Sequence, residues 1–192
     1  MPLLPALAFA RQLIEGRLKN GGRALDGTAG NGRDTLFLAQ LVGGNGKVWA
    51  FDIQAQALSN TAGLLRENGV EERVELIAAS HADLADYVRE PLDAAMFNFG
   101  YLPGGDKTVT TKADSSVRAM QAAAALLAEG GLLTAVVYSG HPAGRAEAAA
   151  IEQWAAALPQ EQYQVLHYRF TNQRNHPPQL LAIEKHIRKP NR

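Results

Sequence analysis

The sequence contains no cysteine, which excludes disulfide bonds, thiolate metal sites and cysteine nucleophiles. It also contains no uninterrupted apolar stretch close to the ~20 residues of a membrane-spanning helix. Its 19 lysine and arginine residues balance 19 aspartate and glutamate residues, so no net charge draws the chain toward nucleic acid or membrane. Residues 1–20 lack the basic leader and cleavage site of a signal peptide. We therefore expect a cytoplasmic protein with no membrane partner.

The chain has enough apolar residues for one substantial core, because 46% of its 192 residues are hydrophobic. We expect a single domain over residues 1–192. Strand patterns alternate with helical patterns along most of the chain, which predicts a parallel sheet with helices on both faces. The last two predicted strands, 163–170 and 180–185, have no helix between them and should form an antiparallel hairpin. The predicted fold is α/β and Rossmann-like, with a seven-stranded, mostly parallel sheet and an antiparallel terminal hairpin.

A glycine-rich turn follows the first predicted strand. That strand ends at Asp26, the turn covers residues 27–32, a helix follows, and a second strand (47–51) leads to Asp52. In a right-handed βαβ unit both strand ends lie at one rim of the sheet, where such folds bind ligands. Glycines let the backbone approach a ligand closely, and the start of the helix offers free N–H groups. Asp52 is suited to accept hydrogen bonds from two ribose hydroxyls, so the unit should bind a nucleoside.

The spacing of the glycines indicates which nucleoside. Glycines at 27, 30 and 32 do not fit G-x-G-x-x-G, the pattern that admits a pyrophosphate. Asp26 would repel a pyrophosphate but suits a cation, and S-adenosylmethionine carries a sulfonium, an ammonium and a ribose. The pattern D-x-T-x-G-N-G followed by D-I-Q resembles motif I and the acidic loop of class I S-adenosylmethionine-dependent methyltransferases. The competing interpretation is a tight turn that binds no nucleotide.

The predicted cofactor-binding residues come from the loops after the first three strands. They are Asp26, Thr28, Gly30, Asn31, Gly32, Asp34, Asp52, Gln54, Ser80 and His81. Ser80 and His81 should meet the edge of the adenine. Alternatively, Ser80 caps the turn that follows it and His81 is a solvated loop residue.

The loop after the fourth predicted strand (92–97) reads Asn98-Phe99-Gly100-Tyr101. It resembles the N-P-P-Y motif of methyltransferases that act on amino nitrogens, although Phe99 and Gly100 replace both prolines. That resemblance implies two catalytic residues: Asn98, which orients the amine, and Tyr101, which packs on the substrate base. The competing interpretation is a strand-ending turn in which Asn98 and Gly100 serve backbone geometry.

Other polar residues at the ends of strands are candidates for binding the substrate. They are Lys107, Tyr138, His141, Arg174 and Asn175. His141 would act as a proton acceptor or a substrate contact, and the competing interpretation is a structural histidine. Arg174 would hold a phosphate. No grouping of His, Asp and Glu has metal-ligand spacing, so no metal site is predicted. The serine-hydrolase pattern G-x-S-x-G is absent from the sequence.

Several motifs together resemble the YtqB-like rRNA methylase family of class I methyltransferases. They are DGTAGNGRDT, FDIQ, SHADL, NFGYLPGGDK, YSGHPAG and NQRNHPP followed by QLLAIEK. The resemblance implies methylation of the 5-aminomethyl group on wobble 2-thiouridine of tRNA, giving 5-methylaminomethyl-2-thiouridine (MnmM-type activity). It also implies a homodimer that grips the anticodon stem-loop.

Two other classes of function stay open from the sequence. One is a methyltransferase that acts on rRNA, a protein or a small metabolite. The other is a nicotinamide-dependent oxidoreductase or a non-catalytic nucleotide-binding module. Asp26 and the Asn98–Tyr101 loop argue against the second class.

Overall fold

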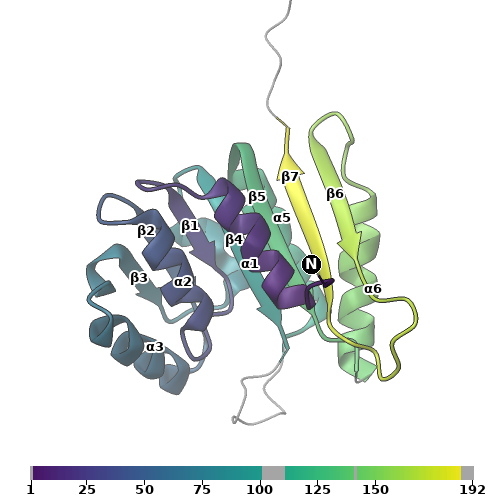
Figure 1. Ribbon diagram of the computed structural model, residues 1–192, viewed down its shortest axis with the longest axis horizontal. Helices are drawn as coiled ribbons and strands as arrows, with labels where there is room; N and C mark the ends of the chain where they lie inside the picture. Colours follow the sequence, from purple (N-terminus) through teal and green to yellow (C-terminus); the bar gives the residue numbers. More distant parts are fainter. Residues whose placement is uncertain (1, 101–110, 141, 187–192) are drawn as a thin grey trace, which may run out of the picture.

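The computed structural model describes residues 2–100, 111–140 and 142–186. Three of the predicted site residues, Tyr101, Lys107 and His141, lie outside the described residues. Figure 1 shows a central sheet with helices on both faces.

Seven strands form one sheet in the order β3-β2-β1-β4-β5-β7-β6. The strands are β1 (Arg23–Asp26), β2 (Lys47–Phe51), β3 (Val74–Ile77), β4 (Leu92–Phe99), β5 (Leu127–Val137), β6 (Tyr163–Tyr168) and β7 (Gln179–Lys185). Neighbours from β3 to β5 pair in parallel, whereas β7 pairs antiparallel with both β5 and β6. The predicted seven-stranded sheet with its antiparallel terminal hairpin is confirmed.

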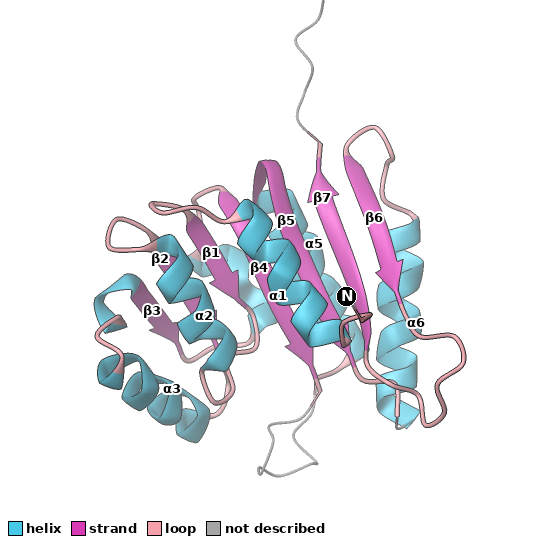
Figure 2. Ribbon diagram, in the orientation of Figure 1, coloured by secondary structure: helices cyan, strands magenta, loops and turns pink. Residues whose placement is uncertain are grey.

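The helices form a layer on each face of the sheet (Figure 2). They are α1 (Ala6–Arg17), α2 (Arg33–Val42), α3 (Ala55–Glu67), α4 (Leu84–Tyr87), α5 (Ala113–Leu126) and α6 (Pro142–Ala156), with short 3₁₀ turns η1 (Glu71–Arg73) and η2 (His81–Asp83). Side chains of α1, α2 and α3 share one core cluster, and those of α4, α5 and α6 share another. Adjacent residues of β4 supply both clusters, because successive side chains of a strand point to opposite faces. Met96 belongs to the first and Phe97 to the second.

Two strands differ from the pattern expected from the sequence. β4 continues to Phe99 rather than ending at Phe97, because Asn98 and Phe99 pair with Val136 and Val137 of β5. Asn98 is therefore a strand residue, not a loop residue. The apolar run at residues 132–138 predicts a fifth strand that begins after Gly130 and Gly131, whereas β5 begins at Leu127.

The early start of β5 coincides with a register shift in its pairing with β4. Leu92 pairs with Leu127 but Ala94 pairs with Leu132, so the intervening residues of β5 are accommodated as an irregularity. Gly130 takes a left-handed φ of 76° there, a conformation that glycine adopts without steric cost. Glycines that look like the end of a helix therefore lie inside a strand.

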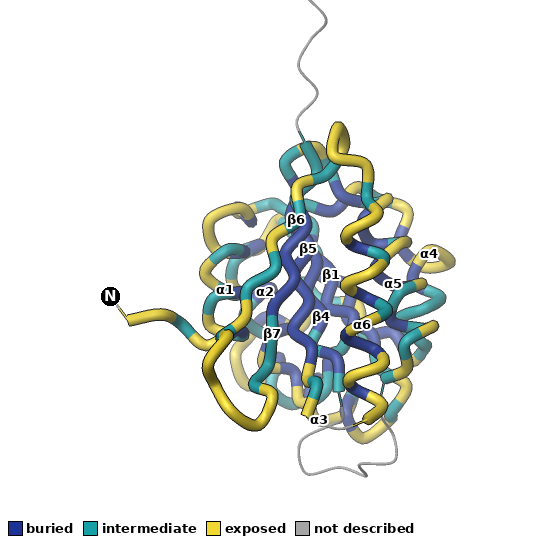
Figure 3. The backbone as a smooth tube through the Cα atoms, turned by 90° about the vertical axis from the view of Figure 1, so that its right-hand side faces the viewer, coloured by how far each residue is buried: buried dark blue, intermediate teal, exposed yellow. Residues whose placement is uncertain are grey.

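The carboxyl ends of β1, β4 and β5 lie at one edge of the sheet, called here the carboxyl edge. The β6–β7 loop (169–178) is at the same edge, because Gln179 at the start of β7 pairs with Val137 at the end of β5. The segment before α1 is attached nearby, since the Tyr168 hydroxyl donates a hydrogen bond to the Leu4 carbonyl at 2.8 Å. Figure 3 shows the buried strands between the helical layers and the exposed β6–β7 loop.

Among the described residues, no helix is long and apolar enough to cross a membrane.

Candidate functional site

The glycine-rich turn between β1 and α2 has little room for side chains. A Cβ on Gly27 would lie 2.1 Å from the Phe97 ring. Gly30 and Gly32 take left-handed φ values of 53° and 80°, and a Cβ on Gly32 would also lie 2.9 Å from the Thr61 Cα. Glycine is required here by both conformation and space. The turn therefore presents bare backbone at the carboxyl edge, as predicted from the sequence.

Asp26 ends β1 and is buried beneath this turn, with 1% of its surface exposed. One carboxylate oxygen accepts the Thr28 N–H at 3.0 Å, and the other accepts the Thr35 hydroxyl at 2.6 Å. Burial, followed by the nearby charge of Asp34, raises the Asp26 pKa to about 7, although the hydrogen bonds from Thr35 and Thr28 oppose that rise. The negative charge of Asp26 is consequently sensitive to ligands and pH near neutrality.

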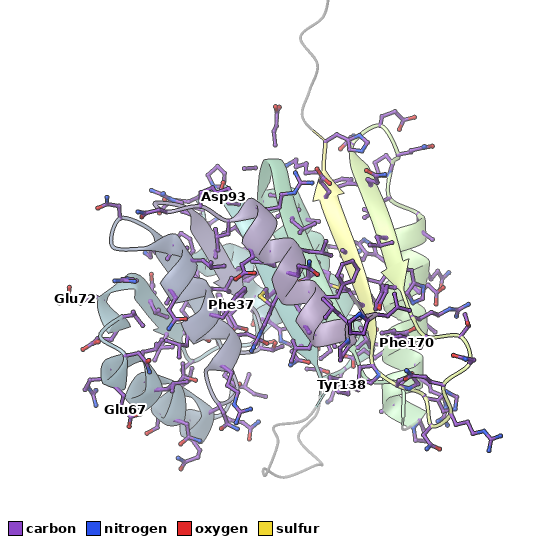
Figure 4. All side chains as sticks on the ribbon, in the orientation of Figure 1. Phe37, Glu67, Glu72, Asp93, Tyr138 and Phe170 are labelled. Atoms are coloured by element: carbon purple, nitrogen blue, oxygen red, sulfur yellow. The ribbon has the colours of Figure 1, made fainter. Side chains whose placement is uncertain are left out.

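Asp34, at the start of α2, is held by an arginine from α1. The Arg11 Nε and Nη2 both donate to Asp34 Oδ1, at 2.9 and 2.6 Å. The Arg11 guanidinium also lies 5.5 Å from the centre of the Phe37 ring, and Figure 4 shows Phe37 on the side of α2 that faces α1. Sequence reasoning missed Arg11, because nothing local in α1 indicates a partner 23 positions away.

Asp52 connects the end of β2 to the glycine turn. Its two oxygens accept the backbone N–H groups of Gly30 and Gln54, each at 2.9 Å. A carboxylate oxygen has a second lone pair, so Asp52 keeps acceptor capacity for ribose hydroxyls while its orientation is fixed. Asn31, the turn residue after Gly30, accepts a hydrogen bond from Asn60 of α3 at 3.0 Å.

Ile53, which directly follows Asp52, was not among the predicted site residues. Its side chain is 66% exposed, which is unusual for a large aliphatic residue beside a rigid strand end. An apolar surface next to a carboxylate that is suited to a ribose also suits the face of a purine. In the sequence, Ile53 is recognisable as the apolar residue directly after Asp52 in the F-D-I-Q stretch.

Ser80 and His81 follow β3 and differ in their surroundings. Ser80 Oγ accepts the Ala82 N–H at 3.2 Å, which is the turn-capping interaction. His81 is only partly exposed, and its ring lies edge-on to Phe97 and Phe99, with ring centres 6.4 and 5.7 Å away. Burial lowers the His81 pKa despite a hydrogen bond to the Gly27 backbone. His81 Nε2 is buried and has no hydrogen-bond partner among the described residues.

Asn98 lies near the end of β4, beside the glycine turn. Its N–H donates to the Thr28 hydroxyl at 2.7 Å, so Thr28 fixes the strand end against the turn. Its side-chain Oδ1 is buried and accepts no hydrogen bond from the described residues. Tyr138 lies close by, because a Cβ on Gly100 would be 3.6 Å from the Tyr138 ring. Figure 4 shows Tyr138 at the end of β5, at the carboxyl edge.

The predicted residues fall into two groups in space. The strand-end residues from β1, β2 and β4 converge on the glycine turn through the hydrogen bonds described above. Arg174 and Asn175 are exposed in the β6–β7 loop at the same edge. Asn175 and His176 take left-handed φ values of 68° and 48°, just before two prolines. The individual binding roles stay predictions.

The chemistry of these residues suits S-adenosylmethionine. The side chains of Asp26, Asp34 and Asp52 surround the turn, and among the described residues only Asp34 is paired with a cation there. Such a site favours a cationic ligand over a pyrophosphate. The bare glycine backbone and the fixed Asp52 carboxylate suit an aminoacyl chain and a ribose. No cluster of three or more His, Asp or Glu side chains suited to a metal ion occurs within the described ranges.

Comparisons with known proteins agree with this assignment. The family model described as "Putative rRNA methylase" matches residues 48–184. The chloroplastic tRNA (mnm(5)s(2)U34)-methyltransferase of Arabidopsis thaliana is 37% identical over 164 residues, which cover 80% of this chain and 60% of that protein. This chain thus spans only about 60% of the length of that curated relative.

Solved structures of similar proteins match nearly the whole chain. A "putative rRNA-methylase" from Clostridium thermocellum has a TM-score of 0.95 and 38% identity, covering 96% of this chain and 100% of that one. A "putative methyltransferase" from Streptococcus mutans, in complex with SAH, has a TM-score of 0.89 and 35% identity, covering 96% and 99%. The chain belongs to the rRNA methylase family of class I S-adenosylmethionine-dependent methyltransferases.

Proposed function

We propose that the protein transfers the methyl group of S-adenosylmethionine to the 5-aminomethyl nitrogen of wobble 2-thiouridine in tRNA. The product would be 5-methylaminomethyl-2-thiouridine. Two observations support this proposal. The Arabidopsis relative is named as a tRNA methyltransferase for mnm(5)s(2)U34, and the site contains a buried acceptor, Asn98 Oδ1, that suits an amine.

The Asn98 side chain carries the argument for an amine acceptor. A buried oxygen that accepts no hydrogen bond is costly, so its position favours a ligand that donates one. An amine N–H bonded to Oδ1 would turn the nitrogen lone pair toward the methyl group of the bound cofactor. The bound cofactor supplies that methyl group as an electrophile on its sulfonium sulfur. Positioning of the nitrogen would then account for much of the rate.

The amine must be neutral to react, yet an aliphatic amine is mostly protonated at neutral pH. Water or His141 would accept that proton. Asp26, Thr28, Gly30, Asn31, Gly32 and Asp34 would shape the methionine side of the cofactor site. Asp52 and Gln54 would hold the ribose, and Ser80 and His81 would meet the adenine. Tyr101 would pack on the substrate base, with Lys107, Tyr138, Arg174 and Asn175 contacting the RNA.

The proposal extends to the assembly and its surroundings. A homodimer would hold one anticodon stem-loop, and the protein would work in the cytoplasm, where the tRNA is. Light scattering of the purified protein with and without the stem-loop would test the dimer. A monomeric mass under both conditions would remove the dimer from the proposal without affecting the chemistry.

The experiment that tests the reaction is transfer of labelled methyl from S-adenosylmethionine to three RNA pools. They are tRNA carrying 5-aminomethyl-2-thiouridine, the unmodified tRNA transcript and rRNA. We expect label only in the modified tRNA, on the wobble nucleoside. Label in rRNA alone, which the description of the family model would favour, would keep the enzyme class and overturn the tRNA substrate.

Asn98→Ala tests the role of the amide. Because the amide is proposed to position the amine, turnover should fall about 100-fold, in the range of a lost positioning contact. Cofactor affinity, measured by calorimetry, should change less than about twofold, because the Thr28 contact is made by the backbone N–H of Asn98. Asn45→Ala, at an exposed residue between α2 and β2, is the control. If cofactor binding collapses while turnover at saturation is unchanged, the assigned role is wrong.

A further inference from the structure

A series of charges runs from helix α1 to the floor of the cofactor site. Arg11 of α1 donates two hydrogen bonds to Asp34 of α2, at 2.9 and 2.6 Å. The Asp34 charge acts on Asp26 of β1, which lies beneath the glycine turn. Asp34 is 8% exposed and Asp26 is 1% exposed, so water screens these charges weakly.

We infer that Arg11, Asp34 and Asp26 form a charge-linked series through which helix α1 sets the preference of the site for the cationic cofactor over its neutral product. The inference rests on the proposed use of S-adenosylmethionine. Loss of the methyl group converts the sulfonium to a neutral thioether, so cofactor and product differ by one positive charge. An ionised Asp26 attracts the cofactor through that charge and gives no such advantage to the product. Arg11 is therefore a positioning residue, since it acts through Asp34.

The groups that face Asp26 explain why the series controls its charge. Thr28 of the turn and Thr35 of α2 donate hydrogen bonds that favour the ionised form, whereas Asp34 and Asp52 oppose it. Arg11 offsets the Asp34 charge. His81, from η2, bonds the Gly27 backbone next to Asp26, and burial lowers its pKa, which disfavours a positive charge on this ring. The β4 residues beside β1 at this point, Ala95 and Met96, carry no charge.

The raised pKa of Asp26 sets the direction in which cofactor affinity changes with pH. With the Asp26 pKa at about 7, the free site is largely protonated at pH 6 and largely ionised at pH 8. Binding of a cation then competes with a proton at low pH, which weakens cofactor affinity about tenfold at pH 6 relative to pH 8. Affinity for the product should change less over the same range, because the product keeps the ammonium but lacks the sulfonium charge.

The test is calorimetric binding of S-adenosylmethionine and S-adenosylhomocysteine to the whole protein between pH 6 and 8, without RNA. Titrations in two buffers of different ionisation enthalpy count the protons released. We expect the ratio of the two affinities to rise with pH and more protons to be released near pH 7 with the cofactor than with the product. In Arg11→Gln the unpaired Asp34 should move the midpoint of this profile up by about one unit, which weakens cofactor binding at pH 7 about fivefold.

Two further variants separate this series from a structural role of Arg11. Arg17→Gln removes another ion pair of the same helix, from Arg17 Nη2 to Glu184 Oε2 at 2.8 Å, and should leave the profile unchanged. In Arg11→Gln with Asp34→Asn the midpoint should return to or below its original value, because no unpaired carboxylate remains.

The outcomes distinguish the inference from the proposed function. A ratio of affinities independent of pH, or an equal shift in Arg11→Gln and Arg17→Gln, would overturn the charge-linked series alone. A failure of both ligands to bind at any pH would instead overturn the cofactor assignment on which it rests.

Discussion

Gly32 is the residue at which the conformation of the glycine turn between β1 and α2 can be tested most directly. Its φ is 80°, and a Cβ would lie 2.9 Å from the Thr61 Cα. Left-handed backbone costs an L-residue roughly 1–2 kcal/mol, and the contact with α3 adds to that cost. We therefore expect Gly32→Ala to lower the free energy of unfolding, measured by urea denaturation, by about 2 kcal/mol or more.

Gly63→Ala provides the matched control. Gly63 is in α3, the same helix that crowds Gly32, but a Cβ there would meet nothing within 4 Å. Replacing a helical glycine by alanine should raise the free energy of unfolding by about 0.5–1 kcal/mol. Equal effects of the two variants on the free energy of unfolding would show that the turn tolerates a side chain at position 32, contrary to its left-handed conformation.

For individual residues, the sequence predicted their place in the fold better than it predicted which side chains they contact. Asp26 and Asp52 could be placed at one edge of the sheet from the sequence. Asp26 ends a strand pattern, Asp52 directly follows one, and the two strands are parallel. Arg11 was not found, because its pairing with Asp34 depends on how α1 lies across α2. The burial of the Asn98 oxygen was equally invisible, since it depends on β4 continuing two residues beyond its apolar run.

The packing of α5 against α6 depends on a buried polar pair. Glu147 of α6 is 2% exposed, and Ser116 of α5 donates its hydroxyl to Glu147 Oε1 at 2.5 Å. A buried carboxylate that loses a hydrogen-bond donor is left poorly solvated. Ser116→Ala should therefore lower the free energy of unfolding by about 1.5–3 kcal/mol, the range for a hydrogen bond to a charged group.

The neighbouring serine offers a close comparison. Ser115 donates to the Lys112 carbonyl in an exposed position at the start of α5, and Ser115→Ala should cost under about 0.5 kcal/mol. Thermal and urea unfolding of both variants would check the difference. If Ser115→Ala proved the more damaging, the capping of α5 rather than the α5–α6 contact would control its stability.

At the level of elements, chain order and periodicity predicted the sheet and its hairpin, but some element ends were misplaced. Gly130 and Gly131 resemble the glycines that end a helix. In the structure they lie within β5, where its pairing with β4 shifts register. The residues before them join β4 only because Leu92 is available to pair with Leu127. Such tertiary pairing overrides local preference and leaves no signal in a single segment.

Across the whole molecule, the sheet collects its polar loops at the carboxyl edge. The sheet takes in strands from Arg23 to Lys185, which supports the proposal that residues 1–192 form one domain. The β6–β7 hairpin adds a cationic feature to that edge, because residues 162–183 contain no aspartate or glutamate but include Arg169 and Arg174. An RNA substrate bound near Asn98 would find two cationic side chains, Arg169 and Arg174, on this hairpin to attract its phosphates.

This arrangement makes Arg174 the residue to test for binding the RNA backbone. A phosphate contact contributes to affinity without reading sequence, so Arg174→Ala should weaken tRNA binding and reduce the slope of log affinity against log salt by about 0.7–1. Cofactor affinity should stay unchanged, because Arg174 is exposed in the β6–β7 loop, and β4 and β5 lie between that hairpin and β1, which leads into the glycine turn. Arg89→Ala is the control, since Arg89 lies before β4 beside Leu127, at the opposite edge of the sheet. Filter binding at several salt concentrations measures both slopes, and a loss as large in Arg89→Ala as in Arg174→Ala would mean that the RNA does not approach from the carboxyl edge.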